Sequence, residues 1–483
     1  MLKKITIVFF AALSFISGNA QGQRIKSANF SFFTESQQEQ YNPQLPQKTF
    51  ALNSTDFVIL SRKTKDAYAL ERYGKSMKPQ WATPIDLLSQ ETVEAFAQQA
   101  QTALVITHRI SIETSTQALY ARTIDLATGK ELQKKKLLEA PANSRKLVVS
   151  LSKDGSKLVT QHYLQKGDQL QGIQAIVYDG ALNVLKERRY DFPVHTGGLT
   201  AQVQIDNHGS QYLTLLTENS MRLSVRRYNN QNNEIKVMEV MLGGAFNQEK
   251  VYVLDTKFQL EQDSTLYAAA LVAEEKTGEY RSLKLVRFDY RTNNMRFAEE
   301  FLFTPAFLER IAKANNLSTT AHLEDIYLSD ILVSKDGQLA VITEKKFLEA
   351  GPDGKYRAQD LLLFGYDEYL KPTWNSMIKK DQQAPAAEGF SGISYRTQLF
   401  GNRLQMLTLE TLNGKTDLYT RSIHLLTGAS EAPKATGLKL ANNQQAAFAK
   451  DFTTWLDERT ITAVYKPAKS SKGLRLSRIT YKL

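Results

Sequence analysis

The chain has 483 residues, of which 42% are hydrophobic and 23% charged, and this composition excludes an intrinsically disordered protein. The formal net charge is +11, but the longest basic cluster is only Lys134–Lys136, so no extended basic stripe for nucleic acid is present. The complete lack of cysteine excludes disulfides, thiol catalysis, lipid attachment at a cysteine and cysteine-based metal sites.

Residues 1–20 have the layout of a secretory signal peptide. Lys3-Lys4 precedes the mostly apolar run Ile5–Ile16, and Gly18-Asn19-Ala20 places small residues before a cleavage site at Gln21. The apolar run is too short to span a bilayer comfortably. We therefore expect an exported chain that has no transmembrane segment after cleavage. Because exported eukaryotic proteins of this size usually carry disulfides, we expect a bacterial protein that is periplasmic, secreted or associated with the cell surface.

One strand recurs along the rest of the chain, residues 21–483. It contains apolar residues, often a basic residue, then Tyr, Phe or Ile, and ends in a turn-forming polar residue. The aromatic or Ile positions are Tyr73, Ile124, Tyr178, Tyr228, Phe288, Tyr366, Ile423 and Ile479. They are 50 to 60 residues apart, except for one step of 78. Self-similarity at a nearly fixed period indicates a repeat architecture.

Two further echoes set the register of the repeat. The hairpin sequence Ser152–Gly155 matches Ser334–Gly337, and Asp206–Gly209 is a looser third copy. Asp-Gly and His-Gly supply the positive φ of a tight turn between two strands. Met77–Ile85 and Leu370–Ile378 share the pattern Lys-Pro-x-Trp-x-x-x-Ile at the same offset from the recurring strand. One unit therefore contains four antiparallel strands, and radial repetition of such units predicts an all-β propeller.

We count eight units. They span about residues 50–90, 100–140, 146–194, 200–242, 250–304, 322–380, 389–436 and 442–483. The last unit has only three strands, and the strand-like segment at residues 24–33 is otherwise unpaired. We expect this segment to supply the missing strand and close the ring. A seven-bladed ring with one unit misread and two smaller β-domains remain as alternatives.

One segment interrupts the β pattern. Residues 305–316 place Phe307, Leu308, Ile311 and Ala314 at helical spacing, with Pro305 suited to the start of a helix and an Asn pair to its end. We expect a short helical insertion between two blades. It either fills a gap against its neighbours or acts as a lid on one face of the ring.

The Ser-Lys-Asp-Gly hairpins and Lys-Pro-x-Trp strands resemble the repeats of secreted bacterial β-propellers of the TolB-like type. The resemblance covers nearly all of residues 21–483 but concerns the fold. The Gly-His and Trp-Asp pairs of WD-type repeats are absent, so the likeness to that type is also one of fold alone. It implies no specific family and no functional residues.

The sequence assigns no catalytic, binding or metal-ligating residue and no cofactor. The six histidines, His108, His162, His195, His208, His322 and His424, have no compact zinc spacing, although several blades can build a site together. Glu324, Asp325 and Asp330 form an acidic cluster that fits a solvated strand start better than a catalytic pair. In Arg222–Tyr228 and Tyr280–Arg291, Arg alternates with aromatic residues, which indicates packing.

These observations favour an exported, non-enzymatic binding or scaffolding propeller. One face of the ring would bind a protein or an anionic glycan, and nucleic acid is not expected as a partner. The alternative is a hydrolase or lyase whose site is assembled from several blades at the mouth of the central channel. The two hypotheses differ in the side chains expected there, because an enzyme needs convergent ionisable groups.

Overall fold

A computed structural model describes residues 23–33, 45–192, 198–246, 249–261, 264–316, 322–351, 354–384, 390, 393–438, 440, 448–468 and 473–481. The predicted signal peptide and its cleavage site at Gln21 lie outside the described residues, as does His195.

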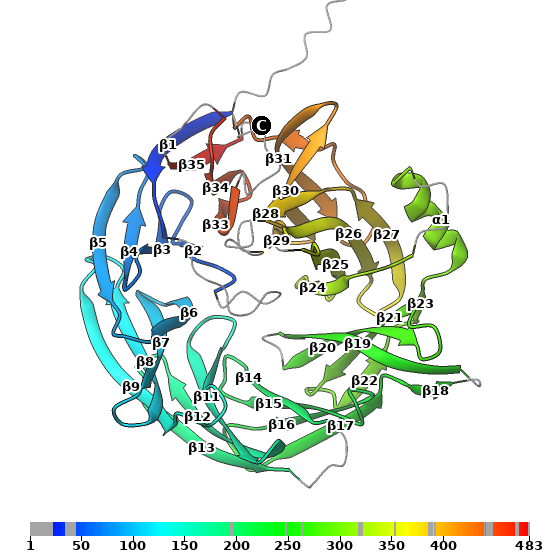
Figure 1. The fold of residues 1–483 in the computed structure, drawn as a ribbon, viewed down its shortest axis with the longest axis horizontal. Coiled ribbons are helices and arrows are strands. Elements are labelled where there is room, and N and C mark those ends of the chain that lie inside the picture. The colour runs from blue at the N-terminus through cyan, green and yellow to red at the C-terminus, as the bar shows by residue number, and fades with distance from the viewer. Residues whose placement is uncertain are drawn as a thin grey trace, which may run out of the picture.

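Eight antiparallel sheets stand radially around one axis and form a closed ring, with the first strand of each blade innermost and the fourth outermost (Figure 1). Blade 1 contains β2 (Thr49–Ala51), β3 (Phe57–Thr64), β4 (Ala67–Tyr73) and β5 (Pro79–Asp86). Blade 2 contains β6 (Glu91–Gln99), β7 (Thr102–Ser111), β8 (Thr116–Asp125) and β9 (Glu131–Pro141). Blade 3 contains β10 (Val148–Leu151), β11 (Lys157–Lys166), β12 (Gln169–Asp179) and β13 (Val184–Asp191). Blade 4 contains β14 (Thr200–Ile205), β15 (Gln211–Thr217), β16 (Arg222–Tyr228) and β17 (Ile235–Met241).

Blades 5 and 6 carry short additional strands. In blade 5, β19 (Glu249–Leu260), β20 (Thr265–Glu274) and β21 (Tyr280–Asp289) are the first three strands, and the outer strand is interrupted into β22 (Asn294–Phe297) and β23 (Phe301–Leu302). The additional short strand β18 (Gly244–Phe246) pairs with the start of β19. Blade 6 contains β24 (Ile326–Val333), β25 (Leu339–Leu348), β26 (Tyr356–Tyr366) and β27 (Pro372–Ile378), continued by β28 (Gln382–Ala384). Blade 7 contains β29 (Tyr395–Phe400), β30 (Arg403–Leu412), β31 (Lys415–His424) and β32 (Lys434–Ala435).

The two ends of the chain share blade 8, which confirms the predicted closure and the count of eight. This blade contains β33 (Phe448–Asp457), β34 (Thr460–Tyr465), β35 (Leu474–Thr480) and, as its outer strand, β1 (Arg24–Phe30). β1 pairs with β35 over seven residues, from Arg24 opposite Thr480 to Phe30 opposite Leu474. A second contact joins the ends on the inner side, where the Lys48 N–H donates to the Asp451 carbonyl oxygen at 2.7 Å.

The hydrophobic core is divided among the boundaries between blades. Second strands such as β15 and β34 are buried along their whole length, because both of their faces pack against neighbouring blades. Outer strands such as β13 and β17 instead alternate mostly between exposed and half-buried residues, and each has a single buried residue. Phe57, Phe452 and Leu476 belong to one cluster that joins blade 8 to blade 1, so the described core continues across the closure.

The sequence echoes have structural explanations. Gly155, Gly209 and Gly337 each adopt a positive φ in the hairpin between the first two strands of a blade. Trp81 and Trp374 lie on outer strands, and each indole Nε1–H donates to a carbonyl oxygen in the next blade: Leu126 at 3.2 Å and Leu425 at 2.5 Å. The motifs are therefore turn and packing signatures, as predicted.

The predicted helical insertion is confirmed as α1 (Pro305–Ala314), which lies at the outer rim of the ring (Figure 1). The Thr304 hydroxyl caps its start by accepting from the Phe307 N–H at 3.3 Å, and Asn315 ends it. Phe307 packs on Phe301 and Phe364, so the helix fills space between blades 5 and 6. In the described part of the chain, α1 is the only helix, and its ten residues are too few to cross a membrane.

One predicted boundary is wrong. The second unit begins at Glu91, not near residue 100, because β6 is its first strand. The polar sequence Glu91–Gln99 hides this strand, since only three of its nine residues are buried.

Candidate functional site

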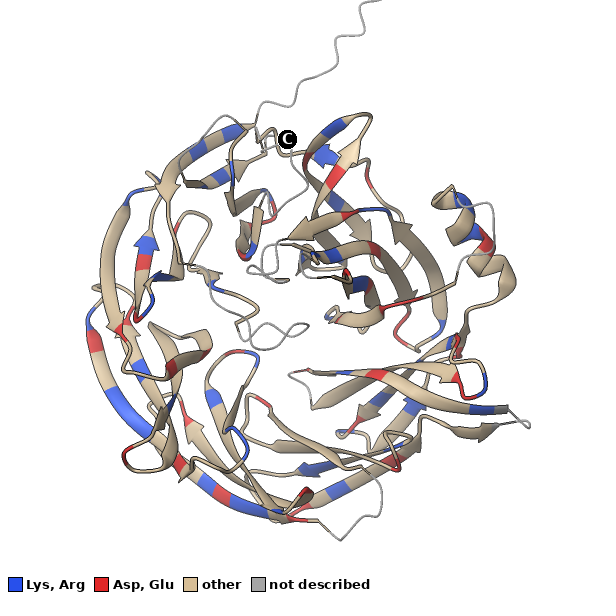
Figure 2. Cartoon of the chain, in the orientation of Figure 1, with Lys and Arg blue, Asp and Glu red and all other residues tan. Residues whose placement is uncertain are grey.

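Each first strand begins on the face of the ring that also carries the connections between blades and the turns between second and third strands. We call this the connecting face. Four antiparallel strands return the chain to the face from which it started, so residues near the starts of β24, β29 and β33 and the end of β25 lie together there. Figure 2 shows that lysines and arginines are distributed over all parts of the ring.

Four of the inner strands are bulged, and each bulge carries an acidic residue. The pairing register shifts at Glu94 in β6, just before Asp255 in β19, just before Asp330 in β24 and at Lys450–Thr453 in β33. Bulges break the ladder locally and redirect side chains, and they are frequent beside binding and active sites.

Each of these acidic side chains contacts the next blade. The contacts are Glu94 with Lys146 at 2.9 Å, Asp255 with the Leu328 N–H at 2.8 Å, Asp330 with the Tyr395 hydroxyl at 2.7 Å, and Asp451 with Lys48 at 3.8 Å. Burial raises the pKa of Asp255, although the N–H groups of Leu328 and Thr256 oppose the rise. These carboxylates therefore hold neighbouring blades together.

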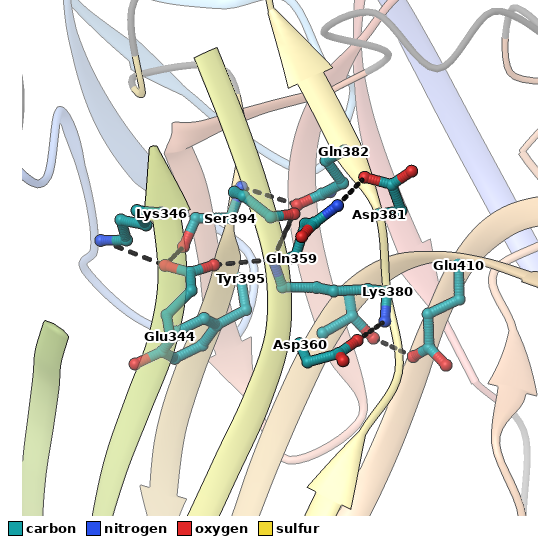
Figure 3. Close-up of polar contacts among 12 residues, drawn as sticks. Glu344, Lys346, Gln359, Asp360, Lys380, Asp381, Gln382, Ser394, Tyr395 and Glu410 are labelled. Carbon is teal, nitrogen blue, oxygen red and sulfur yellow. Dashed lines mark hydrogen bonds and ion pairs between the residues drawn. The ribbon is translucent and has the colours of Figure 1, made fainter. Parts of the chain in front are cut away.

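A fully buried ion pair lies between blades 6 and 7 (Figure 3). Lys380 Nζ is 2.7 Å from Glu344 Oε1, and both side chains are completely buried. Lys346 Nζ is 3.1 Å from the other carboxylate oxygen, Oε2, which also accepts from the Ser394 hydroxyl at 2.6 Å. Burial alone would raise the pKa of Glu344, but Lys380, Lys346 and Lys450 together lower it to about 2. Glu344 is therefore ionised at neutral pH.

Tyr395 is a hydrogen-bond donor in this region. Its side chain is buried and donates to Asp330. Burial raises the pKa of its phenol well above the usual value, and Asp330 and Glu344 raise it further because they repel a phenolate. Tyr395 therefore stays protonated and does not act as a base.

Lys450 differs from the other buried cations. Its side chain is only 9% exposed, and among the described residues its ammonium has no hydrogen bond and no ion pair within 4 Å. Burial, together with repulsion from Lys346 and Arg396, lowers its pKa to about 8, although attraction to Asp451 and Glu344 opposes the decrease. In β33, four residues from Lys450 to Thr453 stand opposite the single residue Ala463 of β34. The bulge thus places an almost buried cation without a partner at an inner strand.

Arg396 is the neighbouring cation on β29. It is half-buried, and the only hydrogen bond of its guanidinium to the described residues runs to the Pro46 carbonyl oxygen at 3.3 Å. Lys346, Arg396 and Lys450 come from blades 6, 7 and 8, and we call them the cation triad.

The sequence did not single out the triad. The signal was present in Phe448–Asp457, where the charged pair Lys450-Asp451 interrupts an otherwise apolar and Thr-rich strand. No comparable local signal marks Lys346 or Arg396, because their proximity to Lys450 depends on how the blades are arranged.

The described histidines are not brought together. His108 is buried against Gln117 Oε1 at 2.8 Å in blade 2, and His322 is exposed beside Glu279. His162, His208 and His424 belong to blades 3, 4 and 7. Among the described residues, no three His, Asp or Glu side chains form a group that could hold a metal ion.

The predicted acidic cluster is divided by the structure. Glu324 is exposed near Lys345, and Asp325 is exposed just before β24, as expected of a solvated strand start. Asp330 instead points to blade 7. The alternating Arg and aromatic residues of β16 and β21 make contacts within and between blades, such as Arg227 Nε to the Tyr212 hydroxyl at 3.1 Å, which confirms the packing interpretation.

Two cavities open between blades elsewhere. One of about 290 Å³ lies between blades 3 and 4 beside the pair Arg189–Asp191, and one of about 270 Å³ lies between blades 7 and 8 beside Arg403–Glu431. These ion pairs are well exposed and already formed, so they offer a ligand little electrostatic gain. The cation triad is the stronger candidate.

The chain matches no protein-family model and no curated protein sequence. Among solved structures, it is similar to the polysaccharide lyase Uly1 at 11% identity and a TM-score of 0.42, covering 80% of this chain and 89% of that one. It is similar to the WD40 domain of SCAP from fission yeast at 9% identity and a TM-score of 0.39, covering 95% and 98%. The β-propeller domain of the Trilobed protease from Pyrococcus furiosus matches at 9% identity and a TM-score of 0.37, covering 80% and 93%. At these identities the likeness concerns the fold alone.

Proposed function

We propose that this protein is an exported, non-enzymatic binding propeller that captures an anionic glycan at the centre of its connecting face. The observation that carries the proposal is the contrast between the acidic and basic groups there. Asp330, Glu344 and Asp451 each contact a partner in the protein, whereas Lys450 has no ion pair or hydrogen bond of its ammonium to the described residues. A hydrolase needs a carboxyl group that is free to exchange a proton with its substrate.

The proposed ligand class follows from charge and location. A chain with a formal charge of +11 attracts polyanions, and outside a bacterial cell the abundant polyanions include acidic polysaccharides. The rigid ring supports the inner strands, so a ligand would meet side chains that are already positioned.

Titration of the purified protein with acidic and neutral oligosaccharides tests the proposal. We expect oligogalacturonates or oligoalginates to bind in isothermal titration calorimetry, with affinity that falls as salt rises, and neutral dextran oligosaccharides to give no heat. Equal binding of neutral and acidic chains, or no binding of either, would contradict it.

One observation favours the alternative of a lyase. Lys450, with a pKa of about 8, can accept a proton near neutral pH more readily than an ordinary lysine. The same oligosaccharides report on this alternative, because elimination from a uronate creates a double bond that absorbs ultraviolet light. A steady rise in absorbance with time would replace the binding proposal by the lyase.

A further inference from the structure

We propose that Lys450, Arg396 and Lys346 form an oxyanion subsite that takes one carboxylate or sulfate group of the ligand. This inference rests on the proposed function for its ligand but stands on its own geometry. The shared chemistry is a compact anion with several oxygen acceptors, which three cations from three blades can surround.

The first support is that Lys450 is buried without an ion-pair partner in the part of the chain that the structure describes. A buried ammonium without a counter-ion destabilises the folded protein, and natural proteins almost always pair or solvate such a group. Here Glu344 of blade 6 attracts Lys450, but both of its oxygens already contact Lys380, Lys346 and Ser394. A bound oxyanion would supply the missing partner.

The second support is the bulge that presents Lys450. Three extra residues in β33 interrupt pairing with β34 where Lys450 and Asp451 lie, whereas the inner-strand bulges of blades 2, 5 and 6 each contain one extra residue. The other bulges are explained by the acidic contact to the next blade. Asp451 makes that contact in blade 8, but the larger bulge also holds Lys450, whose position is not explained by a polar contact of its ammonium with the described residues.

The third support is the complementary character of the other two cations. Arg396 contributes a planar guanidinium with several N–H donors, of which the described residues use one, for the Pro46 carbonyl oxygen. Lys346 is held in place by its ion pair with Glu344, so it can share its ammonium with a ligand without first becoming ordered. The triad thus combines the ammonium of Lys346, which its ion pair holds in place, the several N–H donors of Arg396 and the buried ammonium of Lys450.

The test uses the full chain and the variant Lys450→Met, which keeps the length of the side chain and removes its charge. Sodium sulfate and D-glucuronate are the small probes, followed by the acidic oligosaccharide with the highest affinity. We expect Lys450→Met to weaken binding of each probe at least tenfold and to raise the melting temperature without ligand, because it removes a buried unpaired charge. Lys335→Met, an exposed lysine in the hairpin on the opposite face of blade 6, should change neither property.

Each result decides something. Unchanged binding by Lys450→Met, or a lower melting temperature, would show that Lys450 is structural and would overturn the subsite. If Lys450→Met does not fold, Arg396→Gln provides the same comparison, with the same tenfold loss expected. If sulfate binds through Lys450 while acidic oligosaccharides do not bind at all, the subsite stands and the proposed glycan function fails. If an acidic peptide such as oligoglutamate binds more tightly than every oligosaccharide, the oxyanion belongs to a protein partner and the glycan proposal fails.

Discussion

Single side chains join neighbouring blades in two chemically distinct ways. On outer strands, the Trp81 and Trp374 indoles and the Lys135 ammonium donate to carbonyl oxygens in the following blade. On inner strands, carboxylates such as Asp330 accept from the following blade. Among the described strands, every backbone ladder lies within one blade, so such bonds, together with apolar packing, fix each blade against the next.

Trp374 illustrates the residue scale. The indole ring lies against Gly428, where an added Cβ would come within 2.6 Å of the ring, and Nε1–H donates to Leu425. We predict that Trp374→Phe costs about 1 kcal/mol through the lost hydrogen bond. Trp374→Ala should cost about 3 kcal/mol, because it also removes the ring. Urea unfolding at pH 7 measures both, and equal losses for the two variants would show that ring packing contributes nothing.

The Lys380–Glu344 pair gives a prediction about charge burial. Lys380→Met leaves the fully buried Glu344 with one ion-pair partner among the described residues, Lys346, and we expect a loss of about 3–5 kcal/mol at pH 7. The double variant Lys380→Met/Glu344→Gln should recover part of this loss, because no uncompensated charge remains. A double variant no more stable than the single one would indicate that packing, not charge, causes the loss.

The pH dependence of the wild type follows from the same pair. The pKa of Glu344, about 2 in the folded protein, lies below its ordinary value of 4.5. The pair therefore stabilises the protein fully above pH 4.5 and loses this contribution as pH falls from 4.5 toward 2. In Lys380→Met this dependence should weaken, so the stability difference from wild type should be smaller at pH 4 than at pH 7. An unchanged difference would show that Glu344 does not titrate in this range.

Lys450 also has a lowered pKa, but because it is a cation its charge is a cost to folding that disappears as pH rises. Its pKa of about 8 lies below the ordinary 10.5, so the folded state binds fewer protons than the unfolded state between these values, and stability from this residue rises with pH across that window. Oxyanion affinity should fall as pH rises through 8, because Lys450 loses its charge while Glu344 stays ionised. Calorimetric titration with glucuronate at pH 7 and pH 9.5 measures this, and equal affinities would exclude Lys450 from the site.

At the scale of elements, the most informative strand is β1. Its seven pairs with β35 close the ring with a segment more than 440 residues away in the sequence. Helix α1 covers Phe301 and Phe364 at the rim, and its local signals were enough to predict it: apolar residues at helical spacing, a Pro at its start and an Asn pair at its end.

Removal of β1 tests the closure. A chain that starts at residue 35 should unfold or aggregate, because the edge of β35 is exposed and the cluster around Phe30 and Phe452 is opened. A chain that starts at residue 23 keeps β1 and serves as the control. Deletion of the last ten residues removes β35 and should be equally damaging. If either deletion melts like the control, closure by the terminal strands does not stabilise the ring.

At the scale of the whole molecule, the eight blades form a circle of interfaces in which each blade packs mainly against its two neighbours, and a few side chains, such as Lys153 of blade 3 in its ion pair with Glu261 of blade 5, reach a more distant blade. Stability in such arrays is approximately a sum of units and interfaces, and closing the circle adds one interface without adding a unit. The same arrangement gathers the starts of all inner strands around one axis, which is why residues of blades 6, 7 and 8 can form one site.

Export is the prediction that concerns the whole chain. Because residues 1–20 read as a signal peptide, the mature protein should begin at or near Gln21 in the exported fraction of its host. Mass spectrometry of the intact protein checks this directly. An exported chain that retains Met1 or Leu2 would show that the apolar run is not a cleaved signal.

The repeat made most of the fold predictable. Tight turns and strand periodicity are local properties, so the Ser-Lys-Asp-Gly hairpins, the recurring third strands and the free strand at the N-terminus pointed to eight blades and to their closure. The start of blade 2 was missed because more than half of the residues of β6 are polar, so its sequence lacks the apolar alternation that marks a strand.

The candidate site depended on the tertiary structure. The sequence by itself determined that this is a cysteine-free, all-β repeat chain of eight units with a helix at residues 305–316, because turn residues, strand alternation and helical spacing act over a few residues. Only the arrangement of the blades brings Lys346, Arg396 and Lys450 close enough to repel one another, although the first and last are more than 100 residues apart in the sequence. The same arrangement separates Asp330 from Glu324 and Asp325 and places it against the Tyr395 hydroxyl. Electrostatic interactions depend on distance and burial in space, and the radial arrangement of blades sets both.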